Sequence, residues 1–200
     1  MAQWSDNKFS DGRKRDIGII FSRPAVFSAE ECDAMIAWAE AENIAEKDRI
    51  RVSLDSLGEQ PFIRSQQQII VASGARKQAV VRFHRKLREW MRELNNQIWG
   101  FDITRFGKLW LFRYESGDQV GLHYDLRANE YDRKLSALVQ LSPADAYSGG
   151  ELGIGLPVVT ANREQGSLLV FPIWVPHRVM PVTSGVRYAV GCDAIGPTFR

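Results

Sequence analysis

The chain has 200 residues, enough to bury one sizeable hydrophobic core, with 44% hydrophobic residues, 25% charged residues and a formal net charge of +2. This composition excludes a disordered or collagen-like chain, and 26 lysines and arginines against 24 aspartates and glutamates give no overall positive field for nucleic acid. No apolar run approaches the ~20 residues of a membrane-spanning helix.

The first 100 residues carry two helix patterns and one strand pattern. Ser28 and Glu31 have the spacing of a capping box, in which a hydroxyl and a carboxylate satisfy free backbone amides, so a helix is predicted from residue 28 to about 43. Apolar residues at three- and four-residue spacing predict a second, longer helix over 75–98 that ends before a glycine. Residues 66–71 are predicted to form a strand between the two helices.

Beyond residue 100 the pattern changes to short strands separated by glycine and proline. The predicted strands are 108–114, 120–124, 135–141, 151–154, 167–171, 177–182 and 186–192. This succession predicts a mainly β fold, a double-stranded β-helix of the jelly-roll, cupin-like type, buttressed by the two N-terminal helices. Since no repeat or linker interrupts the chain, residues 1–200 are interpreted as one domain, with helical support over about 1–100 and the jelly-roll core over about 105–195.

Cysteine content and the N-terminal stretch predict the cellular setting. Cys32 in a predicted helix and Cys192 in a predicted strand allow at most one disulfide. The first 16 residues carry aspartates, lysines and arginines and do not have the pattern of a secretory signal. A reduced, cytoplasmic protein without membrane association is therefore expected, and no oligomeric state follows from these patterns.

Two of the three histidines fit a metal site. His123 and Asp125 lie in a predicted strand, where residues i and i+2 point to one face and can converge on one ion. A His-x-Asp pattern arises by chance with a probability of roughly 0.2, so it is weak alone. His177 is the obvious third ligand, because two histidines and one carboxylate form the set that holds non-haem Fe(II) with positions left open. Structural zinc more often uses thiolates, and neither cysteine lies at ligand spacing.

Arg187 follows His177 by ten residues and adds a candidate anion-binding group. If residues 183–185 form a three-residue hairpin loop with Gly185 in the left-handed conformation, Val182 pairs with Val186, and His177 and Arg187 point to the same side. A short dicarboxylate then fits between a metal at His177 and the Arg187 guanidinium. A two-residue loop would turn Arg187 outward, so this prediction depends on the turn.

Five sequence blocks follow one another between about residues 105 and 192. They are 114–125, with His123 and Asp125; 133–142, with Gln140; 149–152, with two glycines; 166–172; and 177–187, with His177 and Arg187. In this order the blocks resemble the prolyl-4-hydroxylase-type Fe(II)/2-oxoglutarate dioxygenases, most closely the small bacterial PKHD-type hydroxylases. Five ordered blocks are far more specific than His-x-Asp alone.

The resemblance implies a role for each matching residue. His123, Asp125 and His177 correspond to the iron ligands, and Arg187 corresponds to the partner of the distal carboxylate of 2-oxoglutarate. Tyr114 matches a tyrosine whose hydroxyl often contacts the cosubstrate.

Two other positions depart from the family pattern. Gln140 stands where relatives often have an aromatic residue facing the same carboxylate, and it is carried over as a candidate cosubstrate contact. Leu126, after the aspartate, stands where the family often has asparagine. This second departure affects outer-shell or substrate contacts and leaves the iron ligands intact.

The resemblance also implies an activity. An enzyme of this type uses Fe(II), 2-oxoglutarate and O2 to hydroxylate a C–H bond and releases succinate and CO2, and ascorbate is a further candidate cofactor. The expected substrate is a residue of a protein or peptide, as in prolyl hydroxylation, or a small amino-acid-like molecule.

Two other functions stay open at this point. The first is oxidative demethylation of nucleic acid, as in AlkB-like enzymes; these pair the cosubstrate arginine with a second arginine six residues on, where this chain has Asp193. The basic helix over 76–92 could also hold nucleic acid, although a solvated face is the simpler interpretation, and His84 within it is expected to be an ordinary helix residue. The second is a non-catalytic jelly-roll ligand-binding module, which needs neither the metal triad nor Arg187.

Overall fold

The computed structural model describes residues 20–41, 49–52, 62–69, 77–126 and 132–199. Its helices are α1 (Ala29–Ala41), α3 (Lys77–Leu94) and the π-helix η1 (Asn95–Trp99), which continues α3. Its strands are β1 (Phe21–Arg23), β2 (Arg49–Val52), β3 (Phe62–Ile69), β4 (Arg105–Phe106), β5 (Leu109–Tyr114), β6 (Val120–His123), β7 (Arg133–Gln140), β8 (Tyr147–Gly149), β9 (Leu152–Ile154), β10 (Val159–Thr160), β11 (Leu168–Pro172), β12 (His177–Val179), β13 (Val182–Gly185) and β14 (Arg187–Ile195).

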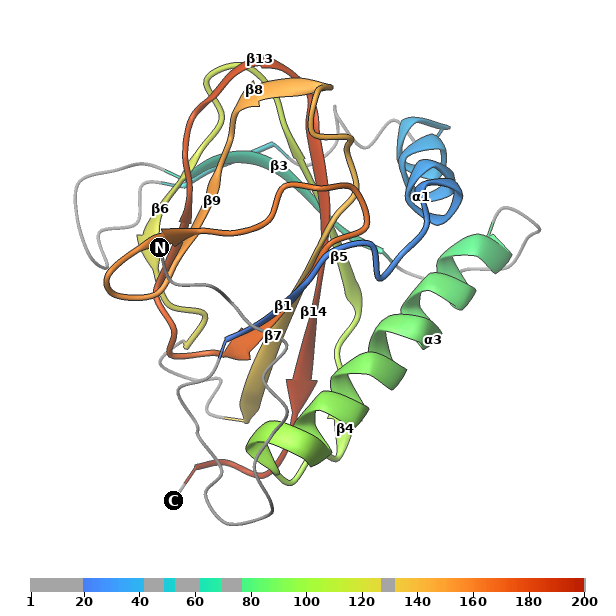
Figure 1. Ribbon diagram of the computed structural model, residues 1–200, viewed down its shortest axis with the longest axis vertical. Coiled ribbons are helices and arrows are strands. Elements are labelled where there is room, and N and C mark those ends of the chain that lie inside the picture. Colours follow the sequence, from blue (N-terminus) through green and yellow to red (C-terminus); the bar gives the residue numbers. More distant parts are fainter. Residues whose placement is uncertain (1–19, 42–48, 53–61, 70–76, 127–131, 200) are drawn as a thin grey trace.

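Within the described residues, the strands form one large antiparallel sheet and two smaller ones. The large sheet has the order β1-β11-β7-β14-β5-β3-β2, and β4 pairs with the end of β14. The strands β10-β9-β12-β6 form a second sheet, and β13 and β8 form a third. Figure 1 shows β6 and β9 across the barrel from β5, β7 and β14. This mainly β arrangement with two flanking helices is the predicted jelly roll.

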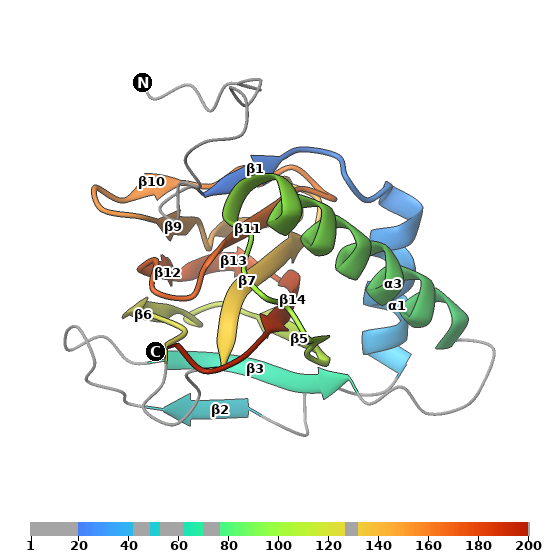
Figure 2. The ribbon, with the colours of Figure 1, turned by 90° about the horizontal axis from the view of Figure 1, so that it is seen from below.

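Helices α1 and α3 cover the outer face of the large sheet, as Figure 2 shows from below. Alternate residues of β14 supply the sheet side of this core, and the helices supply the other side. Phe27, just before α1, stacks on Phe83 of α3 with ring centroids 4.1 Å apart. None of the described helices is long and apolar enough to cross a membrane.

The other face of β14 points into the barrel. Tyr188 and Cys192 belong to the helix-side core, so alternation along the strand turns Arg187, Gly191 and Asp193 inward. On β7, the direct partner of β14, Ser136 lies opposite Asp193 and shares the inner face with it. The central strands therefore carry polar side chains into an otherwise largely apolar barrel.

The local patterns of the first half predict its two helices and β3, but not the short strands β1 and β2. The capping box is confirmed, because the Ser28 amide donates to Glu31 Oε2 at 2.9 Å and the Glu31 amide donates to Ser28 Oγ at 3.2 Å. The second helix is also confirmed, although its last five residues are π-helical and end at Gly100, whose φ is 64°. The strand predicted over 66–71 begins earlier, at Phe62, and its predicted end at Val71 lies outside the described residues.

The predicted hairpin between residues 182 and 186 is wrong. Gly185 does have a left-handed φ of 75°, but Val182 pairs with Gly149 of β8, whereas β14 pairs with β5 and β7. The chain therefore leaves one sheet and enters another at this turn. Arg187 faces the barrel interior because of its position in the central strand β14, and not because it pairs across a hairpin.

Candidate metal centre

Strand pairing brings the two predicted histidine ligands together. His123 is the last residue of β6, and it lies directly opposite His177, the first residue of β12. Asp125 follows two residues later, and its backbone amide donates to the Ile173 carbonyl at 3.0 Å. One ligand atom from each of the three side chains lies within 4.8 Å of the others. Such a set can hold one metal ion from one side.

Backbone carbonyls orient both imidazole rings. His123 Nδ1 lies 2.9 Å from the Gly121 carbonyl oxygen, and His177 Nδ1 lies 3.2 Å from that of Val175. Since a carbonyl oxygen only accepts, each Nδ1 carries the proton, which leaves each Nε2 able to bind a metal. The centroids of the two imidazole rings are 4.2 Å apart. The Phe171 ring packs edge-on against His177, with ring centroids 4.9 Å apart.

The Asp125 carboxylate faces both Nε2 atoms with one oxygen. Its Oδ1 lies 3.7 Å from His123 Nε2 and 3.8 Å from His177 Nε2, while Ser136 Oγ donates to its Oδ2 at 2.5 Å. Burial raises the pKa of Asp125, but the charge of the two imidazoles when protonated, the Ser136 hydrogen bond and the Arg133 charge outweigh burial and hold this pKa below its usual value. An ionised carboxylate is the form that binds a cation.

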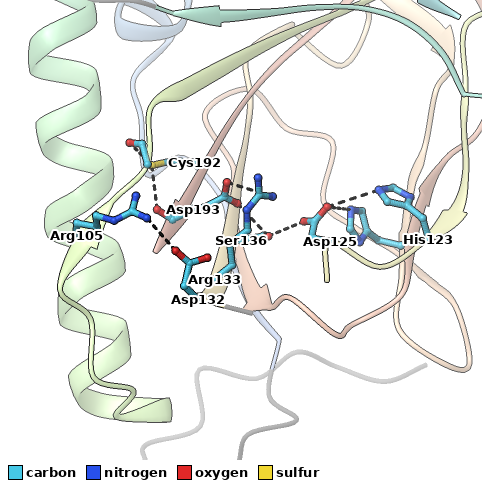
Figure 3. A network of polar contacts seen from close by, with 10 residues as sticks. Arg105, His123, Asp125, Asp132, Arg133, Ser136, Cys192 and Asp193 are labelled. Atoms are coloured by element: carbon cyan, nitrogen blue, oxygen red, sulfur yellow. Dashed lines mark hydrogen bonds and ion pairs between the residues drawn. The ribbon is translucent and has the colours of Figure 1, made fainter. Parts of the chain in front are cut away.

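Polar contacts extend from Asp125 to the rim of the site. Figure 3 shows Ser136 between Asp125 and Asp193, with Arg133 beside Asp193. Ser136 Oγ lies 3.4 Å from Asp193 Oδ1, and Arg133 Nη1 lies 3.5 Å from Asp193 Oδ2. The sequence did not single out Ser136 or Arg133. The available sequence signal for Ser136 was that a serine stands among the apolar residues of β7.

The triad opens into a cavity inside the barrel. Its walls include Trp110, Phe112 and Tyr114, which point inward from β5, and Leu138 of β7. The cavity is open to solvent and has a volume of about 110 Å³. A ligand bound there touches both the metal centre and apolar walls.

A second polar cluster contains the remaining predicted site residues. Arg187 is only 4% exposed, and its Nε donates to Gln140 Oε1 at 3.1 Å. It lies opposite Tyr114 in the β14–β5 register, with its Cζ 5.1 Å from the centre of the Tyr114 ring. Within the described part of the chain, no carboxylate forms an ion pair with Arg187. A buried guanidinium without a carboxylate partner is suited to an anionic ligand, because an uncompensated buried charge is costly.

His84 lies away from the triad, as expected. It belongs to α3, its Nε2 lies 3.1 Å from the Gly107 carbonyl oxygen, and burial together with the Arg88 charge lowers its pKa.

The basic face of α3 is partly neutralised within the described structure. Lys86 pairs with Glu31 at 2.6 Å, and Arg85 pairs with Glu89 at 3.9 Å.

Part of the second half of the chain is similar to a known protein family. Residues 109–192 match the model of the 2OG-Fe(II) oxygenase superfamily. A PKHD-type hydroxylase of Parvibaculum lavamentivorans is 41% identical over 87 residues, which cover 42% of this chain and 40% of that protein. One from Xanthomonas euvesicatoria is 39% identical over 89 residues, covering 38% of this chain and 39% of that protein. The chain thus matches about two fifths of the length of these curated relatives.

Solved structures resemble this chain over most of its length. A prolyl-4-hydroxylase of Pseudomonas putida aligns with a TM-score of 0.73 at 18% identity, covering 90% of this chain and 94% of that one. A prolyl hydroxylase of Trichoplax adhaerens, solved with a peptide fragment of a hypoxia inducible factor, aligns with a TM-score of 0.72 at 16% identity, covering 88% and 83%. At these identities the likeness shows the fold, and it confirms the predicted jelly roll.

Proposed function

We propose that the chain is an Fe(II)- and 2-oxoglutarate-dependent hydroxylase, because residues 109–192 match the model of the 2OG-Fe(II) oxygenase superfamily. The observation that carries the proposal is the convergence of His123, Asp125 and His177 within 4.8 Å. A jelly-roll ligand-binding module without catalysis needs neither these three donors nor the buried guanidinium of Arg187.

The triad fits Fe(II) by donor type and by geometry. Two imidazole Nε2 atoms and one carboxylate oxygen would hold the metal and leave positions for the cosubstrate and O2. With 2-oxoglutarate and O2, bound iron supplies an oxidant that hydroxylates a C–H bond, and succinate and CO2 are released. The Gly121 and Val175 carbonyls keep both rings in the tautomer that presents Nε2.

Arg187 is proposed to bind the distal carboxylate of 2-oxoglutarate. Its guanidinium can offer two parallel N–H donors to a carboxylate, while Gln140 Oε1 accepts from Nε and fixes the plane of the group. Tyr114 lines the cavity and supports the guanidinium with its ring, so we place both Tyr114 and Gln140 in the cosubstrate site. In this scheme Gln140 acts mainly by orienting Arg187.

The substrate class is proposed to be a peptide or protein residue, or a small amino-acid-like molecule. The Trichoplax neighbour was solved with a peptide fragment, which supports a peptide more than a nucleic acid. The ion pairs on α3 and the acidic residue at position 193 do not favour nucleic acid either.

We also propose that the chain folds as one domain and works in the cytoplasm. The helix-side core and the barrel share the large sheet, which supports a single folding unit. Cys32 and Cys192 are buried free thiols, which suits a reducing compartment.

Replacement of Arg187 tests the cosubstrate site. Arg187→Ala should weaken 2-oxoglutarate binding to Fe(II)-loaded protein by at least about thirtyfold, or about 2 kcal/mol, since it removes one partner of a buried charge pair. Anaerobic calorimetry measures this binding. The 2-oxoglutarate affinity of Arg187→Lys should lie between those of wild type and Arg187→Ala, because lysine keeps the positive charge but loses the two parallel N–H donors of the guanidinium.

Arg85→Ala is a matched control, because Arg85 is an exposed arginine on α3 that pairs only with Glu89 among the described residues. It should leave 2-oxoglutarate binding unchanged, and Fe(II) binding should be unchanged in all three variants. Equal 2-oxoglutarate affinity in wild type and Arg187→Ala would refute the assignment of Arg187.

A further inference from the structure

The two oxygens of the Asp125 carboxylate have different partners. Oδ1 faces the two imidazole Nε2 atoms at 3.7 and 3.8 Å, whereas Oδ2 accepts a hydrogen bond from Ser136 Oγ at 2.5 Å. A hydroxyl has a single proton to donate. Ser136 Oγ lies far closer to Asp125 Oδ2 than to Asp193 Oδ1, which is 3.4 Å away. The Ser136 proton therefore belongs to the bond with Asp125.

Ser136 is held rigidly enough to orient this carboxylate. It is 3% exposed and lies in the middle of β7, between Phe171 of β11 and Asp193 of β14 in the strand registers. On the same inner row, Phe171 packs against the ring of His177. One cross-strand row thus supports two of the three proposed metal ligands, Asp125 through Ser136 and His177 through Phe171.

The neighbouring charges favour the same arrangement. Asp193 brings a second carboxylate close to Asp125 through the shared contact with Ser136, and like charges at this separation repel. Arg133 lies 3.5 Å from Asp193 and offsets that charge. The Ser136 hydroxyl thus lies between the two carboxylates. It donates its hydrogen bond to Oδ2, the Asp125 oxygen that faces away from the imidazoles.

From this geometry we infer that Ser136 is a positioning residue that keeps Asp125 a one-oxygen ligand. The inference rests on the proposed iron function, and it concerns how this chain builds the site. With Oδ2 occupied by Ser136, only Oδ1 is presented to a metal, and the position that a second carboxylate oxygen would take stays open for other ligands. Without the hydroxyl, the carboxylate is free to rotate and to bind with both oxygens.

Metal titration of Ser136 variants tests this role without relying on turnover. Co(II), with an absorption spectrum that reports coordination number, is added anaerobically to wild type, Ser136→Ala and Ser136→Thr. Ser136→Ala should bind Co(II) about 10- to 100-fold more weakly, the usual effect of removing an outer-shell partner, and its spectrum should shift. Ser136→Thr keeps the hydroxyl and should restore both affinity and spectrum.

Ser167→Ala is the matched control, because Ser167 is a buried serine whose hydroxyl has no hydrogen-bond partner within the described structure. It should bind Co(II) like wild type, and metal-free thermal unfolding should show that all variants are folded. If wild type binds Co(II) and Ser136→Ala matches it in affinity and spectrum, the positioning role alone is overturned. If folded wild type binds neither Fe(II) nor Co(II), the proposed iron function falls, and the role of Ser136 falls with it.

Discussion

At the scale of single residues, each proposed metal ligand is fixed by a specific neighbour. Gly121 and Val175 carbonyls set the two imidazole tautomers, and Ser136 sets the carboxylate. These contacts hold the three side chains in place before a metal binds, so the donors need little rearrangement when it does. The triad is therefore largely prepared for its ion by the protein itself.

His84, the histidine outside the triad, links stability to pH. Burial and the Arg88 charge lower its pKa below the usual 6.5, while the Gly107 carbonyl acts in the opposite direction. Because the folded pKa is lower than the unfolded one, the unfolded state binds more protons as pH falls through about 6.5, and the free energy of unfolding decreases. His84→Gln should make this acid-linked loss smaller.

Urea unfolding of wild type and His84→Gln at about pH 7.5 and about pH 5.5 measures the difference, on either side of the unfolded pKa. We expect the two proteins to differ less at the lower pH than at the higher one. An equal loss of stability in both would show that His84 does not contribute to acid sensitivity.

The residues that could be predicted from sequence are those with a strong local pattern. His123 and Asp125 were predicted to converge by strand alternation, although β6 ends at His123 and Asp125 lies just beyond it, and His177 was the obvious third donor in a chain with three histidines. Ser136 could not be identified in this way, because its role depends on which strands lie beside β7 and on the loop that carries Asp125. Side-chain contacts between distant segments leave no periodic signal.

At the scale of elements, β14 connects the scaffold to the site. Tyr188 and Cys192 face the helix side, while Arg187, Gly191 and Asp193 face the barrel. The outer contacts are tight: the Tyr188 hydroxyl bonds Glu40 of α1, and Arg113 Nε donates to the same hydroxyl at 3.0 Å. A shift of α1 or β5 would therefore displace β14, the strand that carries Arg187.

Gly191 gives a direct test of how closely the barrel is packed. A Cβ at this position would lie 2.9 Å from Phe112 Cε2 and 3.4 Å from Leu138 Cδ2, and all three residues line the cavity. Gly191→Ala should push the Phe112 ring into the cavity, destabilise the fold by roughly 1–3 kcal/mol and weaken 2-oxoglutarate binding about tenfold.

The double variant Gly191→Ala/Phe112→Leu removes the clash and should recover much of the lost affinity, as measured by the same anaerobic calorimetry. If the single variant binds 2-oxoglutarate like wild type, the ring has room elsewhere, and Gly191 is not needed for the shape of the cavity.

The failed hairpin shows what local turn chemistry can and cannot decide. Gly185 adopts the left-handed conformation that its sequence context favours, yet β13 pairs with β8 and β14 pairs with β5 and β7. A turn fixes the direction of a few residues, whereas strand partners are chosen by the sheets that bury each face. The inward direction of Arg187 was predicted correctly, but for an incorrect reason.

At the scale of the whole molecule, the helices and the barrel have separate tasks. Helices α1 and α3 pack on the outer face of the large sheet, and the proposed site lies within the barrel on the other face. The fold class was predictable because strand lengths, turn residues and two amphipathic helices are local features. The short strands β1, β8 and β10 were not predicted, because they exist only through pairing with β11, β13 and β9.

The most direct test of the proposed function is spectroscopic. Fe(II) and 2-oxoglutarate are mixed anaerobically with the protein, and the visible spectrum is followed for a metal-to-ligand charge-transfer band. Wild type should show the band only when protein, metal and 2-oxoglutarate are all present, since it requires both ligands at one iron. Folded His123→Ala and Asp125→Ala variants should lose it. Absence of the band in wild type, or an unchanged band in both variants, would contradict the proposal that these residues form an Fe(II)/2-oxoglutarate centre.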